Sequence, residues 1–313
     1  MTRIQQVLFE LEAPYTGHPY FVSGNALFNA VAPHVDDETR RELRVSHGVF
    51  VPEEYGEYPA AHSMPGYAGK LGGSLPEVDA YEDLFVYRDA AQRWLLDSRP
   101  RDAHNTHDIQ THGGRVAYAD TSWFGRPEAM RNTRRAVSWY VHCYVSVDGV
   151  DDTIPVPEDV LDGIQVGGAR NYGFGEVSVA DTQVVEVAEL DYSRLEAAEQ
   201  DGESFQVELL TPFVTASAYP GADDQDVPWW WGVTGAEVRR RDTRVVDDSD
   251  VYVVNTIDHG QVVPYTGSDP VRTAMNGVRR VGTHSRFGFG ELRVRPAGEE
   301  RVPGRAETRG GEA

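Results

Sequence analysis

The chain has 313 residues, of which 40% are hydrophobic and 25% are charged, a composition typical of folded globular proteins and not of disordered chains. A formal net charge of −21 argues at first sight against a nucleic-acid partner, because phosphate binding favours a basic surface. No stretch reaches the roughly 20 apolar residues of a membrane span, and the N-terminal segment lacks a signal-peptide pattern. We therefore expect a cytoplasmic protein that has no membrane partner.

The first half of the chain predicts strands and helices in alternation, interrupted by one long segment. A strand is expected at Ile4–Leu11, and Ser23 is a suitable N-cap for a short helix at about 25–31. The segment from about residue 52 to residue 127 is rich in Gly, Pro, His and Asp. It is too long for a simple connection, which indicates an insertion. The pattern then predicts a strand at 136–147, a helical turn beginning at Pro157, and a strand at 176–187.

The second half predicts a similar series of elements. Strands are expected at 205–210, 235–246, 251–265 and 291–295, and Asp269 with Pro270 indicates the start of a helix that runs to about residue 281. We expect residues 1–190 to form one unit, residues 191–202 a linker, residues 203–296 a second unit, and residues 297–313 a disordered tail.

A glycine-rich phrase occurs twice, as GGARNYGFGEVSV at 167–179 and as GTHSRFGFGELRV at 282–294. The glycine pairs are Gly173 with Gly175 and Gly288 with Gly290, and each phrase follows a predicted helix and precedes a predicted strand. Internal repeats report duplicated architecture. Each half therefore fits a βαββαβ series, which predicts an α+β fold of two tandem ferredoxin-like (RRM-like) units with the long loop-rich insertion in the first.

Two interpretations of the phrase remain open. Glycines permit a tight helix-to-strand turn for geometric reasons alone, and they also let a ligand approach the main chain, where free N–H groups bind anions. Arg170 and Arg286 would add a charged group to each loop. The polarity excludes a dinucleotide-binding fingerprint, in which the glycines follow a strand and open a helix.

The scarcity of lysine changes how the net negative charge is interpreted. Lys70 is the only lysine among the 29 basic residues, so the other 28 are arginine. Excess Asp and Glu with lysine nearly absent is typical of adaptation to high intracellular salt, where the Debye length is roughly 3 Å at 1 M. In a halophilic protein the net charge says little about partners, whereas arginines placed beside glycine loops indicate phosphate recognition.

The doubled phrase resembles the hallmark of the RAMP superfamily, which are CRISPR-associated RNA-binding proteins. Their pattern is Gly-x5-Gly-Phe-Gly followed by an apolar strand, and FVSGNALFNAV, LLTPFV and HGQVVPYTG are similar to other segments of members with two units. The resemblance implies antiviral defence through CRISPR guide RNA and other CRISPR effector subunits as partners, with no cofactor. It also implies an RNA path lined by residues of both phrases, namely Gly167, Gly168, Arg170, Gly173, Gly175, Gly282, His284, Arg286, Gly288 and Gly290.

Members of this superfamily are either structural effector subunits or repeat-processing endoribonucleases. His34 and His47 stand near the first predicted helix, where the processing type carries a general acid/base, and Arg44 or Tyr55 would stabilise the phosphorane. Ordinary surface or loop histidines are the simpler interpretation. We expect a non-catalytic subunit that holds the 5′ part of the guide RNA. The alternatives are a metal-independent endoribonuclease that processes the repeat RNA and a structural ferredoxin-like protein that binds no RNA.

One further cluster, RDAHNTHDIQTHGG at 101–114, holds three histidines inside the insertion. His104, His107 and His112 are weak candidates for metal ligands, because their spacing matches no established zinc pattern. A polar solvated loop is the favoured interpretation, so we expect no metal.

Overall fold

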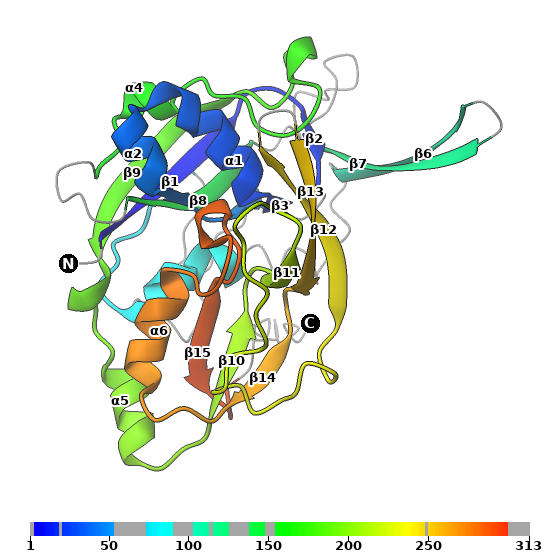
Figure 1. The fold of residues 1–313 in the computed structure, drawn as a ribbon. Helices are drawn as coiled ribbons and strands as arrows, with labels where there is room; N and C mark the ends of the chain where they lie inside the picture. Colours follow the sequence, from blue (N-terminus) through cyan, green and yellow to red (C-terminus); the bar gives the residue numbers. More distant parts are fainter. Residues whose placement is uncertain are drawn as a thin grey trace, which may run out of the picture.

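The protein is described here by a computed structural model. It describes residues 3–18, 21–52, 73–89, 103–112, 115–124, 138–147, 154–247 and 250–299, with only the backbone of the segments between 103 and 124. The tail from residue 300 onward, Lys70 and Tyr55 lie outside the described residues. The fold is mixed α and β, with antiparallel sheets and few helices (Figure 1).

The largest sheet belongs to the first half of the chain. Its strands are β1 (Arg3–Leu11), β3 (Phe21–Val22), β4 (Leu43–Val45), β5 (Gly48–Pro52), β8 (Trp139–Val147) and β9 (Val177–Glu186). They lie in the order β3-β5-β8-β1-β9, with β4 also paired to β8, and every pairing is antiparallel. The first strand of the chain therefore lies in the interior of the sheet, between β8 and β9.

Both faces of this sheet are covered, which explains why β1 alternates only partly in polarity. Val7 and Phe9 pack in one cluster with Leu27 and Phe28 of α1 (Gly24–Val31), and α4 (Glu158–Leu161) adds Leu161 to the same cluster. Successive residues of a strand face opposite sides, and Leu8 on the other face packs with residues 86 and 87. Ser23 caps α1 as expected, since its hydroxyl accepts from the Ala26 N–H at 3.2 Å.

Residues 80–89 form a buried wedge inside the segment predicted to be an insertion of loops. The 3-10 helix η2 (Tyr81–Phe85) and the helical turn after it are almost fully buried. Tyr81 and Phe85 belong to the same core cluster as the strands of the second half, whereas Tyr87 packs with the first sheet. The wedge therefore joins the cores of the two halves.

The second half forms a smaller antiparallel sheet in the order β14-β10-β15, from β10 (Phe205–Leu209), β14 (Val262–Tyr265) and β15 (Leu292–Pro296). Two helices, α5 (Ser193–Gln200) and α6 (Pro270–Val278), lie beside it, and Leu195 and Ala274 pack with its strands (Figure 1). The segment 191–202, expected to be a linker, thus holds α5.

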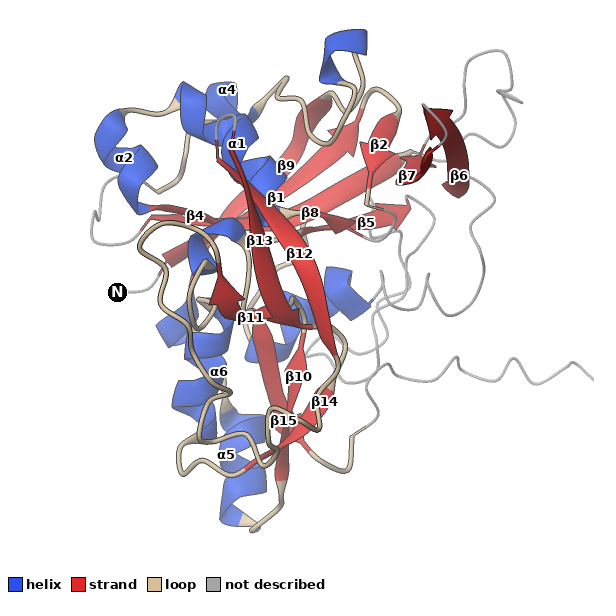
Figure 2. Cartoon of the chain, turned by 45° about the vertical axis from the view of Figure 1, so that its right-hand side comes forward, coloured by secondary structure: helices blue, strands red, loops and turns tan. Residues whose placement is uncertain are grey.

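Two three-stranded sheets complete the fold, and they correspond to one another. In the first half, β2 (Tyr15–Gly17) pairs with the hairpin of β6 (Ala103–His112) and β7 (Arg115–Phe124). In the second half, β11 (Phe213–Ser217) pairs with the hairpin of β12 (Arg240–Asp247) and β13 (Asp250–Ile257). The hairpin β12–β13 lies against α1, where Asn25 accepts from and donates to the backbone of Val246 at 2.9 and 2.8 Å (Figure 2).

Two details of the second half differ from the sequence-based expectation. Residues 210–239, all of which the structure describes, contain no helix, so the helix expected between the first two strands of a βαββαβ unit is missing. The strand expected at 251–265 is two strands in different sheets, β13 and β14, because the chain turns at Gly260, where φ is +76°. No helix in the described part of the chain is long and apolar enough to cross a membrane.

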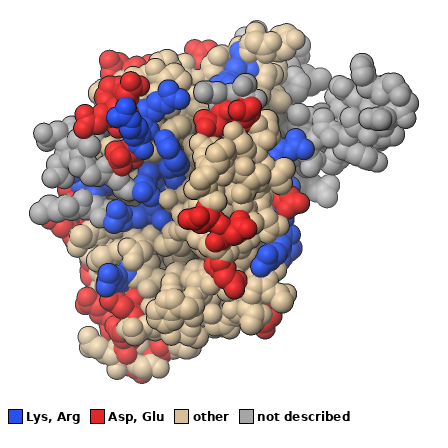
Figure 3. All heavy atoms as spheres, viewed as in Figure 1, with Lys and Arg blue, Asp and Glu red and all other residues tan. Residues whose placement is uncertain are grey.

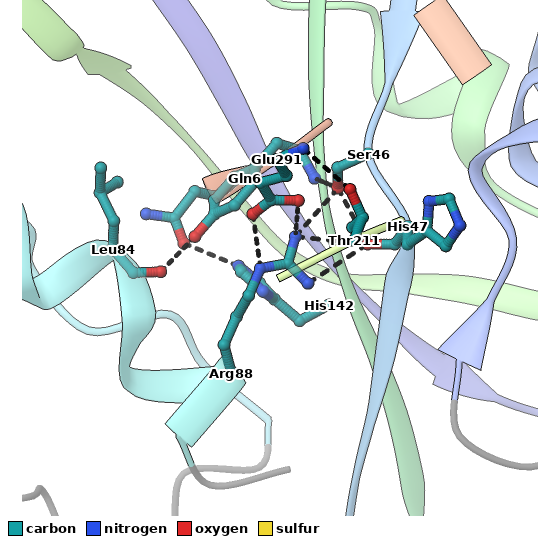
Figure 4. A network of polar contacts seen from close by, with 9 residues as sticks. Gln6, Ser46, His47, Leu84, Arg88, His142, Thr211 and Glu291 are labelled. Atoms are coloured by element: carbon teal, nitrogen blue, oxygen red, sulfur yellow. Dashed lines mark hydrogen bonds and ion pairs between the residues drawn. The ribbon is translucent and has the colours of Figure 1, made fainter. Parts of the chain in front are cut away.

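A network of buried polar groups fixes the wedge between the halves (Figure 4). Arg88 of the wedge makes a two-pronged ion pair with Glu291, at 2.7 Å to one carboxylate oxygen and 2.9 Å to the other, and both side chains are at most 4% exposed. Arg88 also donates to Ser46, whose hydroxyl accepts the Tyr144 N–H. A second buried pair joins Arg293 of β15 to Asp89 of the wedge at 3.2 Å. Buried charges of opposite sign stabilise only one relative position of the elements that carry them.

Candidate nucleic-acid interface

The two glycine-rich phrases adopt the same backbone conformation, residue by residue. Each loop follows a helix (α4 or α6) and precedes a strand (β9 or β15), and each contains one turn of 3-10 helix, η4 (Arg170–Tyr172) or η6 (Ser285–Phe287). The residue before each turn is left-handed, Ala169 at φ 59° and His284 at φ 60°. The residue after each turn is also left-handed, Gly173 at φ 79° and Gly288 at φ 88°.

Their hydrogen bonds are duplicated as well. The N–H of Val166 donates to the carbonyl of Gly175 at 2.9 Å, and that of Val281 donates to Gly290 at 2.9 Å. A Cβ on either Gly175 or Gly290 would lie within 2 Å of a carbonyl oxygen, so only glycine fits there. The prediction that both phrases are helix-to-strand loops of one kind agrees with these geometries.

A second repeated element, which the sequence reading missed, anchors each loop. The N–H of Gly175 donates to Pro14 and that of Gly290 donates to Pro212, each at 2.9 Å, at the end of the first strand of its half. The segments EAPY at 12–15 and LTPF at 210–213 are therefore structural equivalents. In the sequence, a proline followed by an aromatic residue marks both segments. The two prolines are 198 positions apart, whereas the glycine-rich phrases are 115 positions apart, and this unequal spacing hides the repeat.

The first loop lies on the surface. Arg170, Asn171 and Gly173 are exposed, and the Tyr172 side chain is 78% exposed. Among the described residues neither the Arg170 nor the Asn171 main-chain N–H has an acceptor, so two adjacent donors remain available beside a guanidinium. Consecutive free N–H groups of this kind bind anions.

The second loop is wedged against the first half of the molecule. Phe287, at the position that corresponds to Tyr172, is 2% exposed and packs edge-on against Phe28 of α1 at 5.0 Å between ring centroids. A Cβ on Gly24 would lie 2.4 Å from the Phe287 carbonyl oxygen, so the start of α1 contacts the loop backbone directly. The same loop geometry thus serves as a joint between the halves.

Arginines from both halves converge at this joint. We call Arg40, Arg44, Arg280 and Arg286 the arginine cluster. Arg44 donates to the Ser285 hydroxyl at 2.9 Å and Arg280 to the Ser285 carbonyl at 3.0 Å. Figure 3 shows basic side chains gathered from α2 (Asp37–Glu42) to the second loop.

Within this cluster Arg286 carries charge that the protein does not neutralise. Its guanidinium lies 4.7 Å from the Phe28 ring centroid and donates to the Arg40 carbonyl at 3.1 Å. It makes no ion pair within the part of the chain that the structure describes. An anion such as phosphate would complete its coordination.

The outer side of the second loop is aromatic. His284 contacts the Ser217 hydroxyl at 2.7 Å, and its ring lies edge-to-face with Tyr219 at 5.2 Å. Partial burial lowers the pKa of His284. Gly282 is exposed beside it, whereas Gly288 and Gly290 are buried and contribute structure, not surface. Arg170 corresponds in the repeat to Ser285, and Asn171 to Arg286, so the two phrase arginines are not equivalent.

The candidate catalytic histidines do not form an acid/base pair. His47 is buried, and burial first, with the charge of Arg88 second, lowers its pKa well below 6.5. A Cβ on Gly288 would lie 2.4 Å from its Nδ1 atom, so the ring packs against the second loop. His34 is exposed at the end of η1 (Ala32–His34) and makes no hydrogen bond among the described residues.

The three histidines of the insertion lie on one continuous strand, β6, and the side chains there lie outside the described part. His104 and His112 are eight positions apart, about 26 Å along an extended strand, so the backbone of β6 does not bring these two positions together. No group of three potential metal ligands occurs among the described residues.

Comparison with known proteins adds little to this picture. No protein-family model matches the sequence, and no curated protein matches it. One solved structure that matches is described as the crystal structure of the Csm3-Csm4 subcomplex in the type III-A CRISPR-Cas interference complex. The match covers 85% of this chain and 95% of that chain, at 10% sequence identity and a TM-score of 0.33. A likeness this loose does not establish a shared fold.

Proposed function

We propose that the protein is a non-catalytic RNA-binding subunit of a CRISPR interference complex, in which it holds the 5′ part of the guide RNA. The observation that carries the proposal is the duplicated glycine-rich loop. Both copies share their left-handed positions and the main-chain hydrogen bonds described above. Each has arginine beside it, Arg170 at the surface of the first loop and the partly buried arginine cluster at the second. This is the sequence pattern by which the chain resembles the RAMP superfamily.

The proposal includes two ferredoxin-like units that have diverged. In the first half the interior strands β8 and β1 are flanked by β5 and β9, and α1 and α4 connect the strand pairs, as a βαββαβ series requires. In the second half the sheet keeps β14, β10 and β15 with α6, while the hairpin β12–β13 pairs with β11 in a separate sheet. The corresponding hairpin β6–β7 supports a common plan.

The favoured role is that of scaffold. A general acid/base must exchange protons near neutral pH and reach the substrate. His47 does neither, because it is buried and its pKa is lowered, and it instead supports the second loop. RNA would bind through its phosphates along the arginine cluster and the first loop. Long-range electrostatic effects are screened at high salt, so these short-range contacts do not require a basic protein.

The test is filter binding of repeat-derived RNA in several molar KCl, with the protein alone or within its complex. Arg170→Ala and Arg286→Ala are each expected to weaken binding by about 1–3 kcal/mol, the usual loss for a charge-assisted contact. Arg241→Ala is the matched control, because Arg241 is exposed on β12 away from both loops. If Arg241→Ala weakens binding as much as the loop variants do, the loops are only turns.

The same preparation decides between the alternatives. The wild-type protein is expected to leave repeat RNA intact. Specific cleavage that disappears in His34→Ala or His47→Ala would identify the endoribonuclease. Absence of RNA binding, both alone and in the complex, would identify a structural protein.

A further inference from the structure

A pocket of about 220 Å³ opens at the foot of the second loop, on the side away from the first half. Its lining comes from β11, from the segment that precedes β12, from α6 and from the loop itself. The residues are Phe213, Gln225, Asp226, Pro228, Trp230, Thr273, Asn276, Val281 and Gly282. This volume equals about seven water molecules at roughly 30 Å³ each, which suits one planar ring system and is too small for a whole nucleotide.

The pocket is held open by contacts of its own walls. The Gln225 main-chain N–H donates to Thr215 at 2.8 Å, and the Gln225 side-chain amide donates to the Val214 carbonyl at 2.5 Å. The Trp230 ring packs against Trp231 and Tyr265 at centroid distances of 5.9 and 6.0 Å. The segment 225–231 is therefore tied to β11 on one side and to β14 on the other.

The polar groups left for a ligand include both acceptors and donors. The Gln225 amide nitrogen donates one of its two N–H groups to Val214, which leaves the second N–H and the Oε1 atom. One Asp226 oxygen accepts its neighbour's N–H at 2.8 Å, but each carboxylate oxygen has two lone pairs, so both oxygens can still accept. Among the described residues the Asn276 side chain and the Gly282 main-chain N–H make no hydrogen bond, so they supply further donors.

We propose that this pocket binds one unstacked nucleobase, with guanine preferred; the inference deepens, and rests on, the RNA-binding function proposed above. A carboxylate accepts two adjacent N–H groups, and guanine presents N1–H and N2–H side by side on one edge. Its O6 then takes a donor from Asn276 or Gly282. The Trp230 and Phe213 rings provide apolar faces for stacking.

The pocket lies where an RNA strand held by the arginine cluster would place a base. Gly282, in the pocket lining, and Arg286, in the cluster, are four positions apart in sequence, a span of at most about 14 Å. The phosphate contacts fix the position of the strand, and the pocket reads one base.

The surroundings of the second loop differ from those of the first. In the second half Phe213 replaces Tyr15, and the segment 218–239, which holds the three tryptophans, forms the outer wall of the pocket. The proposal of base recognition therefore concerns the second half.

The experiment measures equilibrium binding of repeat-derived RNAs in which each guanine in turn is replaced by inosine, which lacks the N2 amino group. For the wild-type protein, one position is expected to lose about tenfold in affinity. Asp226→Asn should abolish that discrimination while it retains binding of the inosine RNA. Asp223→Asn is the matched control, since Asp223 is exposed in the same segment and does not line the pocket.

A second arm titrates guanosine monophosphate alone, in the absence of RNA, against wild type and Asp226→Asn. Saturable binding that Asp226→Asn removes supports the pocket whatever the source of the base. If RNA binds but every inosine substitution has the same effect on wild type and on Asp226→Asn, the proposal of a base-binding pocket is wrong. The proposed function is not affected by that result. If guanosine monophosphate binds and RNA does not, the pocket stands and the proposed function falls.

Discussion

The two glycine-rich loops share their left-handed positions and several main-chain hydrogen bonds. The first loop nevertheless lies on the surface, whereas the second packs between the two halves of the molecule. Tyr172 of the first loop is 78% exposed, whereas Phe287 at the same place in the second is 2% exposed. Glu176 after the first loop is exposed, and Glu291 after the second is buried against Arg88. Glycines thus determine the path of the backbone, while the segments packed around it determine what each loop does.

The largest expected difference between the loops is in their glutamates. Glu291→Gln leaves Arg88 buried without its counter-charge and should lower the free energy of unfolding by about 3–5 kcal/mol. Glu176→Gln, on the exposed equivalent, should change it by less than about 0.5 kcal/mol. Guanidinium unfolding of both variants measures the difference. Equal losses would show that the Arg88–Glu291 pair does not hold the wedge in place.

The glycines after the two 3-10 turns give the next comparison. Gly173→Ala places a Cβ in open space, so only the left-handed backbone opposes it, at about 1–2 kcal/mol. Gly288→Ala meets the same strain and also drives a Cβ to 2.4 Å from the His47 ring, which raises the expected loss to about 2–5 kcal/mol. Thermal unfolding of the pair tests this, and a larger loss for Gly173→Ala would contradict the packing of His47 on the second loop.

Acid should weaken the joint through buried histidines. Burial lowers the pKa values of His47 and His142 well below 6.5, so both stay neutral in the folded protein, while the unfolded chain takes up protons below about pH 6.5. The unfolded state then binds more protons, and stability falls as the pH decreases from 6.5, by about 1.4 kcal/mol per pH unit for each histidine.

Denaturant unfolding between pH 7.5 and 5.5 measures this slope. Burial raises the pKa of Asp89 to about 6, so this carboxyl takes up a proton in the folded state over the same range and opposes the loss. His47→Leu should still make the slope less steep than in the wild type, whereas His34→Leu, at an exposed site, should leave it unchanged. An unchanged slope in His47→Leu would show that another group controls the acid response.

The sequence predicted what depends on local chemistry and missed what depends on distant partners. Positive φ angles need glycine, so the two loops were visible as a repeat, and the Ser23 cap marked the start of α1. The wedge was interpreted as part of a loop-rich insertion because the segment around it is rich in Gly, Pro, His and Asp. Nothing near Arg88 and Asp89 in sequence shows that Glu291 and Arg293 neutralise them.

The candidate site divides in the same way. Arg286 could be named from its phrase, but the convergence of Arg44 and Arg280 on Ser285, and the contact of Arg286 with the Arg40 carbonyl, depend on how the halves pack. The pocket beside Gly282 could not be predicted, because its wall lies in a segment without regular structure. The second-half helix was expected by analogy with the first half, and no residue pattern in 210–239 required it.

The smallest expected effect concerns the exposed aromatic ring of the first loop. Tyr172 has little packing to lose, so Tyr172→Ala should change the free energy of unfolding by less than about 0.5 kcal/mol. If RNA follows the first loop as proposed, this exposed ring beside Arg170 is available to stack on a base, and its removal should weaken RNA binding by about 1 kcal/mol, roughly fivefold. Val184→Ala is the control, since Val184 is an exposed apolar side chain near the end of β9 that is distant from the first loop. Binding is measured in several molar KCl, where stacking persists and phosphate attraction is screened. If Tyr172→Ala binds RNA as the wild type does, RNA follows the second loop alone, and the exposed copy of the repeat serves another purpose.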